Sequence, residues 1–207
     1  STNQQAMIIG SEIDPIIFNM HKMMQPLLKR NFYIENHDSF NSIDSSINER
    51  GILVLNYPFK PQVIRRNNSA LEISEISFIK ESLKYMNQRG AILVHEGLLI
   101  KSFQNEEAFR KELIENLNLV EAVISLPPCM LPYIRSATSI LVLNENKKDK
   151  SIFMMRADSF INKESLDFEN ENRIYDFTMI YQRKYEIDNI SRVVLYEEIV
   201  NNDFIEK

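Results

Sequence analysis

Short apolar runs typical of buried strands alternate along this chain with amphipathic stretches typical of helices. The runs ILVL (residues 52–55) and AILVH (residues 91–95) are continuously apolar until their ends, as is usual for strands covered on both faces. Between them, the spacing of apolar residues predicts a helix over residues 74–88. Strands that alternate with helices favour a three-layer α/β fold with a parallel or mostly parallel sheet.

The remaining expected elements continue the same alternation. Strands are predicted at residues 7–13, 32–36, 120–126 and 191–196, and helices at 15–30, 106–117 and 172–185, with 60–71 irregular. Gly90 stands where a helix C-cap is expected. Residues 137–143 and 151–155 are predicted to form a hairpin, which would add an antiparallel strand at one edge.

Composition excludes several classes of protein. The 207 residues carry 24 basic and 29 acidic side chains, a formal charge of −5, which argues against a free-standing coat for nucleic acid. With four glycines, the sequence contains neither a G-x-G-x-x-G fingerprint nor a P-loop. The single cysteine makes a reducing cytoplasm the default location, and no apolar run is long enough to predict a membrane span.

Polar side chains follow three of the predicted strands. Glu12 comes after MIIGS, Asp38 just beyond FYIEN, and Asn56 after ILVL. Each alone is commonly a cap or a turn residue. Ligands of parallel α/β sheets bind beyond the carboxyl ends of the strands, so we expect the three side chains to converge on one sheet edge, at a pocket shaped for a nucleoside.

Three segments in this order, GSEIDP (10–15), HDSF (37–40) and NYPF (56–59), resemble class I S-adenosylmethionine-dependent N6-adenine DNA methyltransferases. The modification subunit of type I restriction-modification systems is the nearest match. Further similarity lies in GAILVHEGLL (90–99), LVEAVISLPP (119–128), SATSILVLN (136–144) and SRVVLYEEIVNND (191–203). The resemblance implies a Rossmann-like methyltransferase domain, which we expect over residues 1–160, with a helical or extended appendage over 161–207.

The resemblance also assigns roles to the polar strand ends. Glu12 matches the acidic residue that accepts hydrogen bonds from the cofactor ribose, and Asp38 matches the acid that meets the cofactor adenine. A carboxylate is a suitable acceptor for a diol. The alternatives are a helix-terminal acid for Glu12 and a turn residue for Asp38.

Residues 56–59 match the (Asn/Asp)-Pro-Pro-(Tyr/Phe) loop of the family. The resemblance implies that the Asn56 side-chain oxygen and the Tyr57 carbonyl accept the two N–H bonds of the target amine, while Phe59 stacks on the flipped base. Tyr57 replaces the first proline of the motif, although Pro58 still favours an extended Tyr57. The loop is therefore expected to be less preorganised, and a plain strand-to-loop turn is the alternative.

A small basic cluster, Lys60, Arg65 and Arg66, follows this loop. If the loop binds a flipped adenine, these cations are placed to contact the neighbouring phosphates. The alternative is an ordinary solvated loop. No His or Cys pair has the spacing of metal ligands.

The sequence departs most from the family at its start, since the family's first strand and glycine-containing cofactor loop belong ahead of residue 7, where only STNQQA is present. We expect a fragment or a shortened homologue, with a partner or self-association covering the exposed strand edges. The expected function is an adenine methyltransferase subunit that acts on duplex DNA through a separate specificity subunit, with a restriction subunit as a further partner. The alternatives are a non-catalytic assembly module, and a methyltransferase acting on RNA or protein amides.

Overall fold

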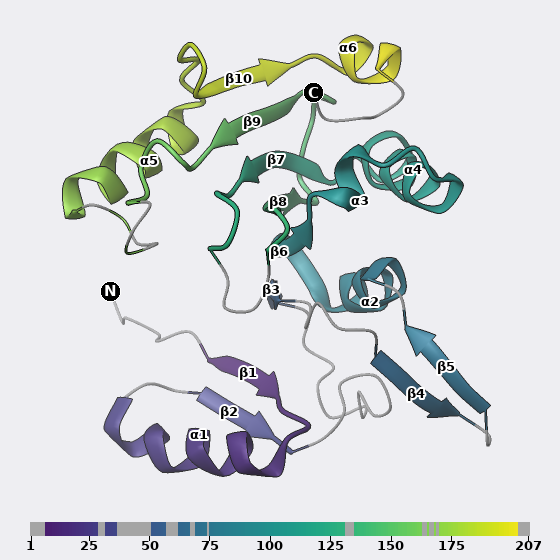
Figure 1. The fold of residues 1–207 in the computed structure, drawn as a ribbon, viewed down its shortest axis with the longest axis vertical. Coiled ribbons are helices and arrows are strands. Elements are labelled where there is room, and N and C mark those ends of the chain that lie inside the picture. Colours follow the sequence, from purple (N-terminus) through teal and green to yellow (C-terminus); the bar gives the residue numbers. More distant parts are fainter. Residues whose placement is uncertain are drawn as a thin grey trace. The chain divides into compact units, whose positions relative to one another are not determined.

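The chain forms two compact units, Ser1–Glu49 and Arg50–Lys207 (Figure 1). The computed structural model describes residues 7–28, 32–36, 51–56, 62–66, 69–73, 75–130, 135–162, 165, 168 and 170–202. From the part expected to form an appendage, Ile180 and Ile199 pack into the buried cores of the larger unit. The boundary expected at residue 160 stays a prediction.

The smaller unit contains strand β1 (Ile8–Ser11), helix α1 (Pro15–Leu28) and strand β2 (Phe32–Glu35). The two strands are parallel, with Ile8 opposite Phe32 and Ser11 opposite Glu35. Helix α1 begins as predicted, because the Asp14 carboxylate accepts the backbone N–H groups of Ile16 (2.7 Å) and Ile17 (3.3 Å). These contacts satisfy N–H groups that have no partner within the helix.

The larger unit contains the other elements of the described chain. They are β3 (Gly51–Asn56), β4 (Gln62–Arg66), β5 (Ser69–Ile73), α2 (Glu75–Ser82), η1 (Leu83–Tyr85), β6 (Met86–His95), α3 (Gly97–Ile100), α4 (Gln104–Lys111), η2 (Glu112–Asn116), β7 (Val120–Ser125), β8 (Thr138–Asn144), β9 (Ile152–Arg156), α5 (Glu171–Arg183), β10 (Ser191–Val194) and α6 (Tyr196–Asn201). None of the described helices has the length and apolar character needed to cross a membrane.

Six strands of the larger unit form one sheet in the order β10-β9-β7-β8-β6-β3. Strands β3, β6, β7 and β9 share one direction, β8 runs against them in the interior, and β10 forms an antiparallel edge. The predicted α/β class and mostly parallel sheet are therefore confirmed. Strand β3 is the opposite edge, since it pairs only with β6 among the described strands.

The predicted hairpin of residues 137–143 and 151–155 is wrong. Strand β7 lies between β8 and β9, pairing antiparallel with the first and parallel with the second. The pattern of β8 explains the outcome, because Leu141 and Leu143 pack into one core while Ile140 and Val142 pack against the other. A strand that is apolar on both faces belongs in the interior of a sheet rather than at its edge.

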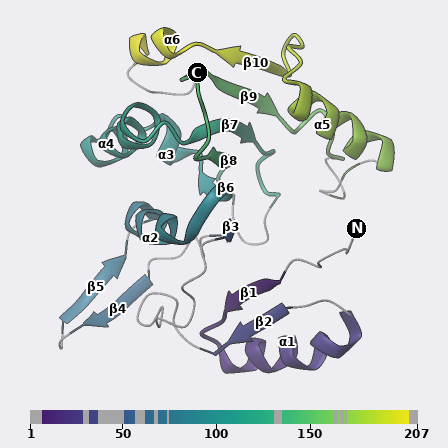
Figure 2. The same ribbon diagram turned by 180° about the vertical axis from the view of Figure 1, so that it is seen from behind.

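The helices cover both faces of this sheet. Ile79 of α2 and Phe109 of α4 pack on one face, whereas Ile180 of α5 packs on the other. Figures 1 and 2 show α2 and α4 on one side of the sheet and α5 on the other. Burial on both faces accounts for the continuously apolar run of β6, whereas Ile52 and Val54 in the apolar run of β3 are exposed.

Gly90 does not cap a helix but lies inside β6. Helix α2 and the turn η1 stop at Tyr85, and β6 already begins at Met86. A Cβ at Gly90 would lie 2.8 Å from Met86 Sδ, so close packing explains the glycine. The segment expected to be irregular also contains the antiparallel pair β4–β5.

Candidate functional site

The carboxyl edge of the six-stranded sheet collects polar residues from several strands. Strands β3, β6, β7 and β9 run in one direction, so Asn56, His95, Ser125 and Arg156 all end strands at this edge. Asn56 is exposed, and its backbone lies opposite Leu93, two residues before the end of β6. This edge is where α/β sheets bind their ligands.

A half-buried carboxylate contacts the end of β6 at this edge. Glu75, the first residue of α2, accepts the backbone N–H of His95 at 2.9 Å, and its other oxygen lies 3.2 Å from His95 Nδ1. Burial raises the pKa of Glu75, although the contacts with His95 act in the opposite direction. The pair holds the imidazole of His95 in one orientation close to the strand that carries Asn56.

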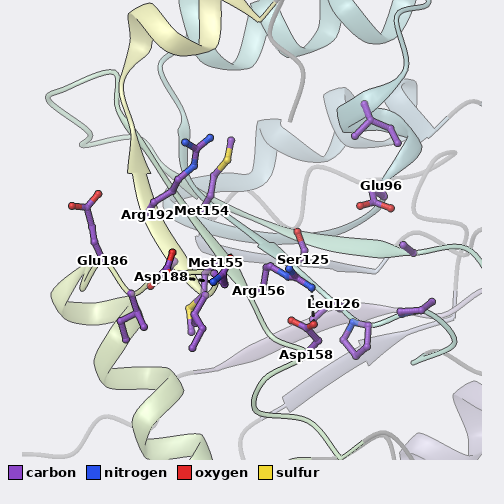
Figure 3. Close-up of a pocket in the computed structure, with 18 residues that line it drawn as sticks. Glu96, Ser125, Leu126, Met154, Met155, Arg156, Asp158, Glu186, Asp188 and Arg192 are labelled. Carbon is purple, nitrogen blue, oxygen red and sulfur yellow. Dashed lines mark hydrogen bonds and ion pairs between the residues drawn. The ribbon is translucent and has the colours of Figure 1, made fainter. Parts of the chain in front are cut away.

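A cleft of about 850 Å³ opens along the same edge, beyond β7 and β9. It is lined by Ser125, the 126–128 segment, Met154–Arg156 and the residues 186–192 that lead into β10 (Figure 3). Arg156 forms an ion pair with Asp158 at 2.8 Å, drawn in Figure 3 as a dashed line. The volume lies in the range of small-molecule sites. Its charges are mixed, with carboxylates outnumbering guanidinium groups, so a purely anionic ligand is not favoured.

In the smaller unit, Glu12 stands at the carboxyl end of β1 as predicted. It is half-buried, and its Oε1 accepts the backbone N–H of Asp14 at 2.9 Å. The Asn36 side chain donates to the Glu12 carbonyl at 2.8 Å, which holds the turn against the end of β2. Each carboxylate oxygen can accept more than one hydrogen bond, so Glu12 has acceptor capacity left beyond its contact with Asp14.

The other predicted site residues divide into two groups. Asp38, Tyr57, Pro58, Phe59 and Lys60 lie outside the described residues. Arg65 and Arg66 end β4, at the tip of the β4–β5 pair. The expectation that one sheet carries both Glu12 and Asn56 is not met, because β1 and β3 belong to different sheets. Strands β1 and β3 each pair along one side only in the described structure. The resemblance implies a further strand, the family's first, at the centre of the sheet.

Sequence reasoning missed the Glu75–His95 pair and the cleft beyond β7 and β9. The sequence shows His95 as the polar end of an apolar strand. Its partner Glu75 lies 20 residues away, and nothing in the sequence distinguishes it from other acidic residues at helix starts. The cleft residues come from segments that only the sheet order brings together. Among the described residues, no group of His, Cys, Asp and Glu is arranged to hold a metal ion.

The fold is that of class I methyltransferases. The methyltransferase subunit of a type I restriction-modification system from Streptococcus thermophilus superimposes with a TM-score of 0.81 at 19% identity. The match covers 97% of this chain and 47% of that one.

The sequence itself is matched by the family model described as N-6 DNA Methylase over residues 1–207. The chain belongs to the N-6 DNA methylase family. The MjaVII type I restriction enzyme methylase subunit of Methanocaldococcus jannaschii is 29% identical over 140 residues, and the MpnII methylase subunit of Mycoplasma pneumoniae is 28% identical over 135. These matches cover 62% and 63% of this chain, and 23% and 24% of the relatives' own lengths. The chain therefore spans about a quarter of these relatives.

Proposed function

We propose that this chain is the catalytic-domain portion of an S-adenosylmethionine-dependent DNA adenine-N6 methyltransferase subunit of a type I-like restriction-modification system. The observation that carries the proposal is the family match over the whole chain, together with Asn56 at the carboxyl end of β3. The methyl donor supplies an electrophilic sulfonium methyl group. The residues of this chain supply positioning, which is the main source of rate in such a transfer.

In this proposal Asn56 performs the central chemical task. The exocyclic amine of adenine is conjugated with the ring and is a poor nucleophile. Accepting its two N–H bonds, through the Asn56 side-chain oxygen and the Tyr57 carbonyl, directs the nitrogen lone pair toward the methyl group. The exposure of Asn56 at a strand end leaves its amide accessible to a substrate. Phe59 is assigned to stack on the flipped base.

Glu12 and Asp38 are assigned to the cofactor. The Glu12 carboxylate suits the ribose hydroxyls, because the only described donor to it is the backbone N–H of Asp14. Asp38 is assigned to the cofactor adenine, and Lys60, Arg65 and Arg66 to phosphates beside the target base. Duplex DNA would be reached through a separate specificity subunit, with a restriction subunit as a further partner, and the cytoplasm is the proposed location. The net charge of −5 suits a subunit that relies on a partner to grip DNA.

A second candidate function is a non-catalytic methyltransferase-like assembly module. Tyr57 favours it, because the residue stands where the family motif has a proline that locks the backbone. Such a module is expected to give no methylated product. The two candidates therefore differ in whether the intact protein transfers a methyl group at all.

The experiment compares methyl transfer to duplex DNA by the intact protein, assembled with its partner subunits, and by two variants. Asn56→Ala removes the side-chain acceptor and should abolish transfer while leaving cofactor affinity nearly unchanged. Asn56→Asp retains an acceptor oxygen of the type the family motif allows, and should keep measurable activity. An Asn56→Ala variant with wild-type activity would show that the loop is misassigned, and an inactive wild type would favour the assembly module.

A further inference from the structure

Arg110 of helix α4 is a buried cation on the face of the sheet that α2 and α4 cover. The residue is 4% exposed. Its Nη1 donates to the Leu98 carbonyl at 2.8 Å and to the Lys101 carbonyl at 2.9 Å. These carbonyls lie at the end of the short helix α3, so this half of the guanidinium caps a helix C-terminus.

The other half of the guanidinium has no partner. Both Nε and Nη2 of Arg110 are enclosed by protein and make no hydrogen bond. Burial lowers the pKa of Arg110, while Glu107 and Glu106 act in the opposite direction. A guanidinium nevertheless stays protonated in proteins, so Arg110 keeps its positive charge although it is buried. An unpaired buried charge is strongly destabilising.

The described acidic residues around α4 act on Arg110 by charge, as Glu106 and Glu107 do, but none forms a hydrogen bond with it. Glu107 lies 3.5 Å from Lys111, one turn further along the same helix. Glu112 forms its ion pair with Lys80 of α2. No carboxylate in the described part of the chain forms a hydrogen bond with Arg110, whose hydrogen-bond partners are backbone carbonyls.

A small cavity borders the Arg110 side chain. Its volume is about 40 Å³, and its other walls are apolar. They include Leu99, Phe109, Val123, Leu141 and Ile199. Leu113 and Ile114, which also line it, belong to the π-helical turn Glu112–Asn116, a type of distortion frequent at functional sites. A water molecule needs roughly 10–15 Å³ of such space, so the cavity has room for one small ion but not for a nucleotide.

We propose that this cavity is a binding site for one small monovalent anion, a halide or a short carboxylate such as formate, held by Nε–H and Nη2–H of Arg110. These two N–H groups lie along one edge of the guanidinium plane and match the two oxygens of a carboxylate. The apolar walls strengthen the attraction between the charges by lowering the local dielectric. The same walls offer no replacement for a hydration shell, which disfavours sulfate.

The test measures thermal unfolding of the intact chain in sodium bromide, sodium formate and sodium sulfate at equal ionic strength. Arg110→Met keeps the length of the side chain and removes the charge, and Arg183→Met is the matched control at an exposed position. An anion at a hundred times its dissociation constant should raise the melting temperature by about 5–10 °C. Wild type and Arg183→Met should show this rise in bromide or formate relative to sulfate, and Arg110→Met should not.

Crystals soaked in bromide provide a second readout that does not depend on the variant folding. An anomalous peak within hydrogen-bonding distance of Arg110 Nε and Nη2 is the expected result. The formate and bromide arms distinguish a carboxylate from a halide as the preferred anion. Equal salt responses in wild type and Arg110→Met, or crystals soaked in bromide and in formate that hold neither anion at Arg110, would overturn the proposal and leave a water or an empty cavity in its place.

Discussion

The two compact units of this chain differ in where their apolar side chains lie. In the larger unit, Ile79, Ile92 and Leu143 expose none of their surface, whereas Ile16, Met23 and Leu27 of α1 expose 70%, 77% and 80% of theirs. A two-stranded sheet needs further strands or a helix packed against it to be stable, whereas a larger sheet can bury a core of its own. The larger unit carries such a core, whereas the described apolar side chains of α1 in the smaller unit lie mostly at its surface.

Both units have a strand with an unpaired edge in the described chain. In β3, Ile52 and Val54 are 76% and 80% exposed, although the strand is paired along its other side with β6. Exposed apolar edges are rare in stable proteins because they invite pairing with another strand. The six-stranded sheet thus ends at β3, whose second edge is unpaired among the described strands. Strand β1 of the smaller unit also has one unpaired edge among them.

The largest effect is expected from the core of the larger unit. Phe109 is 1% exposed, so Phe109→Ala should lower the free energy of unfolding by about 3–5 kcal/mol through lost burial and a cavity. Denaturant titration followed by circular dichroism measures it. The control is Phe103→Ala at a residue that is 65% exposed, with an expected change within about 0.5 kcal/mol. Equal losses in the two variants would contradict the core assigned here.

A polar anchor between α5 and β7 should give the next largest effect. Glu121 accepts hydrogen bonds from Tyr181 Oη at 2.7 Å, Asn144 Nδ2 at 2.6 Å and Lys184 Nζ at 3.2 Å. Glu121→Gln keeps the shape and one acceptor but loses the charge. It should cost about 1–3 kcal/mol at neutral pH, measured by the same titration.

The pH dependence of stability separates the charge of Glu121 from its packing. Burial by itself would raise the pKa of Glu121, but the hydrogen bonds and the Lys184 charge outweigh it and lower the pKa from 4.5 to about 2. The folded state therefore binds this proton less readily than the unfolded state. The stabilisation is fully present above about pH 4.5 and is lost as the pH falls toward 2. Glu121→Gln should flatten that part of the curve, and an unchanged acid slope would refute this role.

A pair of helix caps compares the two units directly. Asp14 caps α1 in the smaller unit, and Asn170 caps α5 in the larger one by accepting the Arg173 N–H at 3.1 Å. Replacing either residue by alanine should cost about 1 kcal/mol locally. Hydrogen exchange should show Asp14→Ala opening the whole of α1, while Asn170→Ala affects the first turn of α5. Equal spreading along both helices would remove the contrast between the units.

The smallest effect is expected on the exposed face of α1. Leu27→Gln replaces a side chain that is 80% exposed with another good helix former, so the free energy of unfolding should change by less than about 0.5 kcal/mol. Urea titration of the intact chain measures it. A loss as large as that of a core variant would show that α1 is packed in solution.

Much of the fold could be predicted because the apolar runs have the length of strands and are bounded by residues typical of helix starts and strand ends. Asp14 and Pro15 marked the start of α1, and ILVL marked β3, with Asn56 at its end. The order of strands was harder, because pairing of β7 with both β8 and β9 depends on contacts between distant segments. Gly90 was misread because a glycine after a helix and a glycine crowded by Met86 look alike in sequence.

The candidate site was predictable in part for a related reason. Strand ends identify Glu12 and Asn56 as residues at a carboxyl edge, but not which strands share a sheet. The Glu75–His95 pair and the unpaired half of Arg110 depend on burial and on partners far along the chain. No local pattern of residue types distinguishes such groups from ordinary surface charges.

The most direct test of the proposed function identifies the methylated nucleoside. Duplex DNA incubated with S-adenosylmethionine and the intact protein in its assembled complex is digested to nucleosides and separated by mass spectrometry. The proposed function predicts N6-methyladenine as the product, at a level that Asn56→Ala reduces to background. Methylation of cytosine, or no methylated base from an assembly that binds both the cofactor and DNA, would contradict it.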